Sequence, residues 1–362
     1  MADMTIKQYI YSRGVQAGVP VGGTFELTPR CNLDCKMCYI HSSERDDVAR
    51  KQELTTEQWM RLGQEAVEAG MVYLLLTGGE PMLRSDFAAI YSGLAKMGII
   101  LSVNTNGTIL SQEVLVAFLE CPPERVNVTL YGASSDTYHS LCGNPGGYAA
   151  AIQNIQALKN AGINVAINTT FTKLNAGDMS QIVTFAKELD IPISMAAYLF
   201  PTICGGCGAE TVFLEPNELG RLAAQFDRMT LPEPTVQSRM EMLRDPAVNW
   251  QAWAEESRAS KCTAGRGSFW ITWDGKMVPC GMLSNGVSVL ELGFPKAWLS
   301  TKEKIKRYLL PRECMDCQHR AICPSCVAVS TDQDGNVGVL KPQLCDQTKA
   351  YVADFLAIGE GT

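Results

Sequence analysis

The stretch from residue 24 to residue 38 reads TFELTPRCNLDCKMC. Its first part, Thr24–Thr28, is rich in β-forming residues and predicts a strand. Cys31, Cys35 and Cys38 follow directly, in C-x3-C-x2-C spacing. Three thiolates this close together can hold three irons of a cubane cluster and leave the fourth iron without a protein ligand. The stretch therefore predicts a strand that leads into a catalytic iron–sulfur site.

Zinc is the main alternative metal for these three thiolates. A structural zinc site has four protein ligands, and no fourth cysteine or histidine follows at the spacing of a zinc finger. His41 is close enough in sequence to keep the zinc alternative open. The spacing nevertheless favours a cluster over zinc and over three buried thiols.

The chain around these cysteines alternates short β-rich runs with amphipathic helical stretches, which is typical of βα units around a parallel sheet. Six runs are expected as strands: Thr24–Thr28, Val72–Leu76, Ile100–Asn104, Arg125–Leu130, Asn164–Thr169 and Ile193–Phe200. Helices are predicted between them, for example over Thr56–Ala69 and Tyr148–Ala161. The pattern predicts an α/β fold, an open partial (βα)6 barrel similar to a TIM barrel. Ligands of such folds bind in the loops after the strands, where polar, glycine-rich segments lie at residues 77–81, 105–107 and 131–133.

A C-x3-C-x2-C motif after the first strand of a partial βα barrel resembles the hallmark of the radical S-adenosylmethionine (radical SAM) superfamily. The resemblance covers residues 22–201, and it implies a [4Fe–4S] cluster on Cys31, Cys35 and Cys38. It also implies that S-adenosylmethionine contacts a second set of residues: Gly78, Gly79, Glu80, Asn106 and Thr129. In this set the glycines would let the backbone approach the ligand, and the Glu80 carboxylate would suit the methionine ammonium group. Thr129 stands where relatives place a hydroxyl against the ribose.

The resemblance also implies a mechanism. One electron, supplied by a flavodoxin- or ferredoxin-type donor, cleaves S-adenosylmethionine into methionine and a 5′-deoxyadenosyl radical. The radical then abstracts a hydrogen atom from a substrate that the protein holds in place.

A second group of cysteines lies near the C-terminus. Its members are Cys262, Cys280, Cys314, Cys317, Cys323, Cys326 and Cys345. Residues 269–279 lie among them and predict a hairpin that turns at Asp274-Gly275. Zinc ribbons are the alternative for this group, because paired C-x2-C motifs also hold zinc.

The spacing of these seven cysteines resembles the SPASM extension of radical SAM enzymes, which houses two auxiliary iron–sulfur clusters. One departure is the x2 spacing before Cys326, where x3 is usual. The resemblance implies two auxiliary clusters of [4Fe–4S] type and two ligand sets. One set is Cys314, Cys317, Cys323 and Cys345, and the other is Cys262, Cys280 and Cys326. The second set is one ligand short.

Cys204 and Cys207 follow the sixth predicted strand and should face the same cavity. Three roles remain open for them: ligand of the incomplete cluster, donor of a hydrogen atom to a substrate radical, or inert loop thiols. The first two roles make them candidate catalytic residues.

Composition limits the compartment and the partners. The 362 residues carry a net charge of −7, with 46% hydrophobic and 19% charged residues, so we expect neither a nucleic-acid surface nor a membrane surface. Fourteen cysteines without a secretory signal favour metal or cluster binding in the cytoplasm over disulfides. Five segments are expected: an N-terminal segment (1–21), the radical SAM barrel (22–205), a helical bridge (206–258), the SPASM domain (259–350) and a C-terminal tail (351–362).

Enzymes with a SPASM extension mostly act on peptides, so a ribosomally made precursor peptide is the expected substrate. The first choice of reaction is a thioether or another side-chain cross-link, and the second is epimerisation with Cys204 or Cys207 as hydrogen donor. Gly281 follows Cys280 where anaerobic sulfatase maturases carry an aspartate, which counts against that activity. Since few residues precede the first strand, a separate protein or the catalytic domain itself should recognise the peptide. A radical enzyme for a small molecule and a zinc-binding protein without redox chemistry are the alternatives of other classes.

Overall fold

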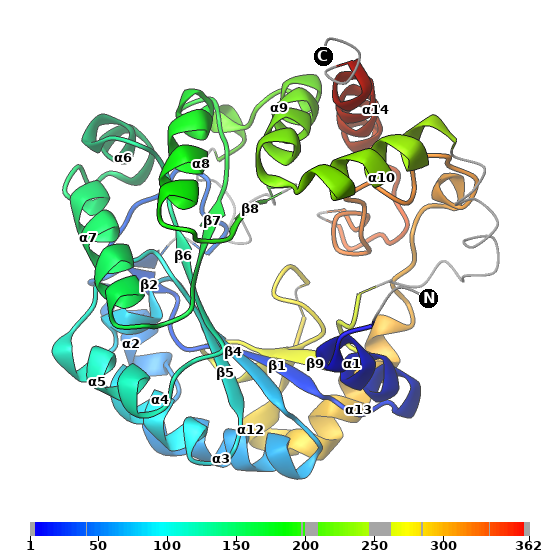
Figure 1. Cartoon of the computed structure of the whole chain (residues 1–362). Helices are drawn as coiled ribbons and strands as arrows, with labels where there is room; N and C mark the ends of the chain where they lie inside the picture. The colour runs from blue at the N-terminus through cyan, green and yellow to red at the C-terminus, as the bar shows by residue number, and fades with distance from the viewer. Residues whose placement is uncertain are drawn as a thin grey trace.

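The computed structural model describes residues 4–40, 42–196, 198–199, 209–245, 262–283, 285–332 and 334–357. Its centre is one large sheet with the strand order β11-β10-β9-β1-β4-β5-β6-β7-β8 (Figure 1). Six of these strands form the predicted barrel: β1 (Gly22–Glu26), β4 (Tyr73–Thr77), β5 (Ile100–Thr105), β6 (Arg125–Thr129), β7 (Val165–Thr169) and β8 (Ile193–Met195). Each of the six is parallel to its neighbours within this set. The predicted partial (βα)6 barrel is thus confirmed.

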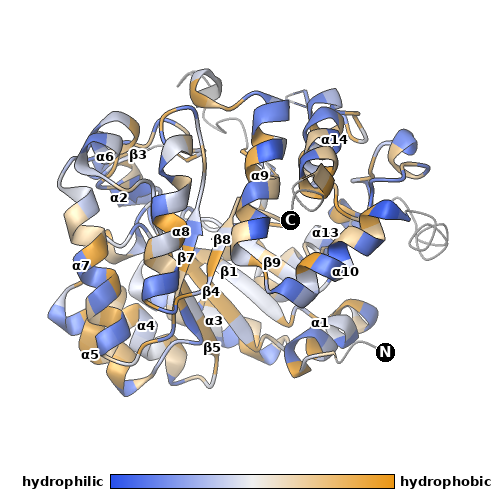
Figure 2. Cartoon of the chain, turned by 45° about the horizontal axis from the view of Figure 1, so that its top comes forward, coloured by the Kyte–Doolittle hydropathy of each residue, from blue (hydrophilic) through white to orange (hydrophobic). Residues whose placement is uncertain are grey.

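Helices cover the outer side of this sheet (Figure 1). They are α3 (Thr56–Glu68), α4 (Phe87–Ala95), α5 (Gln112–Glu120), α6 (Ser135–Cys142), α7 (Gly147–Asn160) and α8 (Met179–Glu188). α3 shows why the chain is helical here: a capping box between Thr55 and Gln58 begins the helix, and Trp59, Leu62 and Ala66 bury one face at helical spacing. Figure 2 shows the hydrophobic residues gathered on the strands and the polar ones on the outer helix faces. The helices predicted over Thr56–Ala69 and Tyr148–Ala161 are confirmed as α3 and α7.

The C-terminal region adds three strands to the same sheet. β9 (Ser268–Ile271) is parallel to β1, and β10 (Lys276–Val278) and β11 (Val287–Ser288) follow in antiparallel pairing. The turn between β9 and β10 has Gly275 at φ 79°, a backbone conformation that favours glycine. The predicted hairpin is confirmed, but its pairing with β1 was not predicted. Phe269 joins the two regions, since its ring lies 4.9 Å from that of Phe294 and 6.4 Å from that of Phe25.

The remaining elements surround the sheet. The helices are α1 (Ile6–Ala17), α2 (Asp47–Gln52), α9 (Pro216–Thr230), α10 (Glu233–Arg244), α12 (Val289–Leu292), α13 (Phe294–Ile305) and α14 (Pro342–Ala357), with short 3-10 turns at Pro81–Leu83, Ala176–Asp178, Ala209–Val212 and Arg312–Cys314. β2 (Arg30–Cys31) and β3 (Ser42–Ser43) form a small second sheet. None of the helices within the described ranges is long and apolar enough to cross a bilayer.

α9 and α14 pack closely against each other, and α9 also contacts β8 (Figure 1). A Cβ atom at Gly220 of α9 would lie 2.2 Å from the Gln347 carbonyl oxygen of α14, so only glycine permits this approach. The Arg228 guanidinium lies over the Phe355 ring, 4.7 Å from its centroid, and donates to the Phe355 carbonyl at 2.7 Å. The predicted boundary between residues 350 and 351 falls inside α14.

Candidate active site

The cysteine loop Cys31–Cys38 lies at the carboxyl end of β1 and lines a cavity of about 240 Å³. The loops after β4, β5 and β6 meet the cysteines there, as expected for the carboxyl edge of a parallel sheet. The wall includes Cys31, Cys35, Cys38, Gly78, Gly79, Asn106, Thr129 and Tyr131. The structure therefore brings the three motif cysteines together with four of the five residues predicted to contact the cofactor.

A buried ion-pair network anchors the chain that leads into this loop. Arg30 donates from Nε to Glu53 Oε1 at 2.6 Å and from Nη2 to Oε2 at 3.1 Å. Arg84, which lies three residues after the segment Gly78–Pro81, donates to Glu53 Oε2 at 3.3 Å and to the Leu27 carbonyl at 2.9 Å. All three charged side chains are buried, with at most 6% of each exposed. Glu53 therefore holds the residue before Cys31 against the segment that carries the glycines.

Gly78 and Gly79 are required by the backbone of the cysteine loop. A Cβ at Gly78 would lie 2.4 Å from the Thr28 carbonyl oxygen, and one at Gly79 would lie 2.4 Å from that of Arg30. The Gly79 N–H donates to the Thr28 carbonyl at 2.7 Å. The glycines thus let the two loops touch, and their backbone also lines the cavity.

Glu80 is fully enclosed and its carboxylate is held by the protein itself. It accepts hydrogen bonds from the Asn106 N–H at 2.7 Å, the Thr105 hydroxyl at 2.9 Å and the Met82 N–H at 3.0 Å. Burial raises the pKa of Glu80 to about 7 against these hydrogen bonds. Asn106 in turn donates from Nδ2 to Cys31 Sγ at 3.5 Å. Glu80 therefore orients Asn106 toward the cysteine loop, and its own contact with the cofactor stays a prediction.

The thiols of the loop lie in a poorly solvated place. Burial raises the pKa of Cys31 to about 12, and a hydrogen bond with the Cys142 thiol together with burial raises the pKa of Cys35. Without a bound metal Cys31 and Cys35 therefore favour the neutral form, and a metal cluster would have to displace their protons. Cys142 is a buried thiol at the end of α6, and its carbonyl accepts from the Asp34 N–H at 2.9 Å.

Two tyrosines near the motif were not singled out from the sequence. Burial and the neighbouring cysteine side chains, Cys35 first, raise the pKa of Tyr131, which lines the same cavity as Cys31, Cys35 and Cys38. Burial also raises the pKa of Tyr39, with contributions from Glu26, Cys38 and Cys280. Tyr39 thus lies between the first cysteine motif and a cysteine of the C-terminal group.

The C-terminal cysteines form the two sets that the resemblance implied. Cys314, Cys317, Cys323 and Cys345 line one cavity of about 260 Å³. Burial raises the pKa of Cys280 to about 11, with smaller contributions from Cys262 and Cys326, so these three thiols are neighbours as well. Tyr39 interacts electrostatically with both Cys38 of the first motif and Cys280 of the second set.

The donor chemistry of these sites suits clusters. In the described part of the chain no three His, Cys, Asp or Glu side chains stand close enough together to share a single metal ion. Thiols on one zinc ion lie about 3.8 Å apart and leave no space between them, whereas the four-cysteine set surrounds a cavity. All donors in each set are thiols, which are the ligands of iron–sulfur clusters. The residues present therefore fit clusters better than single ions.

The surroundings of Gly281 explain why this position is glycine. A Cβ at this position would lie 2.8 Å from the indole ring of Trp270, and Trp270 Nε1 donates to Glu26 at 3.1 Å. An aspartate after Cys280 would therefore displace Trp270. Cys204 and Cys207, the candidate catalytic thiols, and His41 lie outside the described residues.

Comparisons with known proteins agree with this geometry. Residues 25–186 match the model of the Radical SAM superfamily. The AdoMet-dependent heme synthase of Methanosarcina barkeri is 27% identical over 84% of this chain and 90% of that protein. The PqqA peptide cyclase of Methylocella silvestris is 30% identical over 47% of this chain and 45% of that protein.

Solved structures share the fold over most of the chain. Streptococcus suis SuiB bound to the precursor peptide SuiA has a TM-score of 0.66 at 15% identity, covering 92% of this chain and 79% of SuiB. anSMEcpe with bound AdoMet has a TM-score of 0.68 at 14% identity, covering 95% of this chain and 96% of that structure. With the cysteine motif at the carboxyl edge of a partial barrel, these similarities show that the enzyme carries a domain of the radical SAM superfamily over residues 25–186.

Proposed function

We propose that this enzyme abstracts a hydrogen atom from a peptide and forms a thioether or another side-chain cross-link in it. Bound at Cys31, Cys35 and Cys38, a [4Fe–4S] cluster would supply the electron that cleaves S-adenosylmethionine into methionine and the 5′-deoxyadenosyl radical. Gly78, Gly79, Asn106 and Thr129 would hold S-adenosylmethionine, since all four line the same cavity.

The observation that carries the proposal is that Tyr39, in the wall of the cysteine cavity, interacts electrostatically with the first motif and with an incomplete set of thiols. Cys38 and Cys280 both contribute to its raised pKa, and Cys280 groups with only two other described cysteines. Forming a carbon–sulfur bond from C–H and S–H releases one hydrogen atom to the deoxyadenosyl radical, one proton to solvent and one further electron. An auxiliary cluster on Cys262, Cys280 and Cys326 would supply the acceptor for that electron close to the radical.

The peptide class is supported by two relatives. SuiB is described with its precursor peptide, and the Methylocella silvestris protein is a peptide cyclase. A precursor peptide, a flavodoxin- or ferredoxin-type donor and a separate peptide-recognition protein are the partners that we propose. Epimerisation of an α-carbon, with Cys204 or Cys207 returning the hydrogen atom, is the alternative reaction on the same substrate.

A tetrapyrrole is the second candidate substrate, and sequence similarity favours it. Three AdoMet-dependent heme synthases match at 27%, 25% and 22% identity, each over at least 84% of both chains. A shorter match at 29% identity is an Fe-coproporphyrin III synthase. An enzyme that acts on a tetrapyrrole would need the same S-adenosylmethionine site, but the substrate held beside that site would be a tetrapyrrole and not a peptide.

The test is an anaerobic reaction in deuterated water with dithionite, S-adenosylmethionine and the peptide encoded beside the gene. Loss of two hydrogens from the peptide supports a cross-link, and deuterium at an α-carbon without other mass change supports the epimerase. If the peptide stays unchanged while Fe-coproporphyrin III is altered, the tetrapyrrole is the substrate.

The auxiliary set has its own variant and control. Cys326→Ala should lower the iron content and abolish the cross-link while 5′-deoxyadenosine still forms. Cys121→Ala, a half-buried thiol at the end of α5, should change neither. Equal cross-linking by both variants contradicts the role of the auxiliary set.

A further inference from the structure

The outer edge of β8 carries unpaired backbone groups. Among the described strands only β7 pairs with β8. The Pro192 carbonyl accepts from the Ile167 N–H at 2.8 Å, and the Ala196 N–H donates to the Thr169 carbonyl at 2.9 Å. Since a parallel ladder uses every second residue of a strand, the N–H and C=O groups of Ile193 and Met195 face away from β7. The sheet therefore ends in an edge that can accept another strand.

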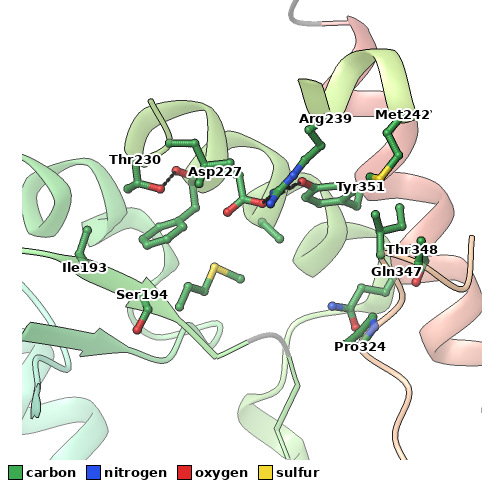
Figure 3. A pocket seen from close by; sticks show the side chains of 16 residues that line it. Ile193, Ser194, Asp227, Thr230, Arg239, Met242, Pro324, Gln347, Thr348 and Tyr351 are labelled. Carbon is green, nitrogen blue, oxygen red and sulfur yellow. Dashed lines mark hydrogen bonds and ion pairs between the residues drawn. The ribbon is translucent and has the colours of Figure 1, made fainter. Parts of the chain in front are cut away.

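This edge faces a cavity of about 550 Å³ (Figure 3). Ile193, Ser194 and Met195 form one wall, and Pro324 with Gln347 of α14 lies opposite. Phe226 and Ala223 of α9, both in the lining, make it largely apolar on one side. The cavity has the volume typical of ligand sites, and the β8 edge forms one of its walls.

A fixed polar group borders the same space. Arg239 of α10 forms an ion pair with Asp227 of α9, and the Tyr351 hydroxyl of α14 donates to Asp227 at 2.8 Å while it accepts from Arg239 at 2.8 Å. Figure 3 shows these three side chains on the wall across from Ile193. Because the group ties α9, α10 and α14 together, it fixes the distance between the helices and the free edge.

Shared wall residues connect this cavity to the active site. Gln347 lines it and also a second cavity of about 370 Å³. Leu199 lines that second cavity and also the one that holds Cys31, Cys35 and Cys38. The three cavities therefore border one another, in the order from the β8 edge to the cysteine motif.

We propose that an extended segment of the substrate peptide binds as an added strand along the β8 edge and runs from there to the cysteine motif. This inference rests on the proposed peptide-modifying function and names the surface that recognises the peptide. Ile193 and Met195 would donate and accept the backbone hydrogen bonds, which serve any sequence. The apolar wall around Phe226 would select side chains on one face of the added strand. A tetrapyrrole has no peptide backbone to offer this edge.

Exposed edges promote aggregation unless they are short or covered. β8 is only three residues long and lines the wall of a cavity between the sheet and the helices α9 and α14, so it offers little edge to another sheet. The short edge therefore disfavours pairing between the sheets of two molecules, while a peptide strand can still reach it.

Hydrogen exchange tests the proposal without turnover. Anaerobic holoenzyme is incubated with about 1 mM acetyl-TVTVTV-amide or with the same peptide N-methylated at every residue, which removes the donors of both strand edges. The unmodified peptide should slow exchange of the fragment containing residues 193–196 at least about threefold, and the methylated peptide should not. Protection by both peptides, or by neither, overturns the proposal.

Two variants localise the effect. Ala223→Trp fills the cavity from α9 and should abolish the protection, whereas Gln225→Trp places the same bulk on the exposed face of α9 and should keep it. Both variants should still cleave S-adenosylmethionine, because neither residue belongs to the cysteine site. Loss of protection in both or in neither contradicts binding at the β8 edge. Failure of the peptide reaction itself would leave these exchange results unchanged, so the two hypotheses are separable.

Discussion

Replacing Glu53 by glutamine tests how the cysteine loop is held. The Glu53 carboxylate is buried and accepts two hydrogen bonds from Arg30 and one from Arg84. Arg84 also pairs with Asp86 at 2.8 Å, so it should keep one carboxylate partner in the variant. Arg30 keeps no carboxylate partner among the described residues, and it stands directly before Cys31.

Breaking a buried ion pair by removing one partner costs about 3–5 kcal/mol. We expect the lower end, about 3 kcal/mol, because glutamine keeps the size of the side chain and one acceptor oxygen. At about 2.1 cal/mol/K per residue, unfolding of 362 residues converts this cost into a Tm lower by about 4 °C. The loosened loop should also bind less iron and yield less 5′-deoxyadenosine.

The assay is thermal unfolding of anaerobic holoenzyme together with iron content. Asp47→Asn is the matched control, because it removes the carboxylate of an exposed pair with Arg50 and should cost less than about 0.5 kcal/mol. Equal Tm values and equal iron content for Glu53→Gln and Asp47→Asn would refute the idea that this network holds the loop.

Two further predictions follow from the same region. Burial raises the pKa of Glu26 from 4.5 to about 7, so the fold loses about 3 kcal/mol as the pH rises from 4.5 to 7. Glu26→Gln should therefore raise the Tm at pH 8 and gain little near pH 5, and a gain that is independent of pH contradicts this. Gly79→Ala should cost at least about 2 kcal/mol and lower the iron content, because its Cβ would meet the Arg30 carbonyl at 2.4 Å. Gly177→Ala, with no atom within 4 Å of the added Cβ, is the control, and equal losses in both would contradict the reasoning.

The six barrel strands could be predicted because local patterns encode them. Each strand is a short β-rich run that ends in polar or glycine-rich residues, and five of the observed strands lie within two residues of the predicted ones. The sixth, β8, ends at Met195, where the prediction extended to Phe200. The pairing of β9 with β1 could not be predicted, because it joins segments more than 240 residues apart through ring contacts such as that of Phe25 with Phe269.

The cysteines of the site could be predicted, but their support could not. Cysteines at motif spacing can be recognised from a single sequence. Glu53 and Arg84 belong to no motif, and they pair only in the folded chain. Tyr39 gives a weak signal, since it directly follows Cys38. The sequence also does not reveal why Gly78 and Gly79 must be glycine. A Cβ at either position would meet the backbone that leads into the cysteine loop, and this contact is known only from the folded structure.

The most direct test of the account is the cleavage of S-adenosylmethionine by the variant with alanine at Cys31, Cys35 and Cys38. With dithionite the wild type should form 5′-deoxyadenosine and the triple variant should form none. A variant with alanine at Cys314 and Cys317 should still form it, since those thiols line a different cavity. Formation of 5′-deoxyadenosine by the triple variant at the wild-type rate would contradict the central claim that these three cysteines build the radical-forming site.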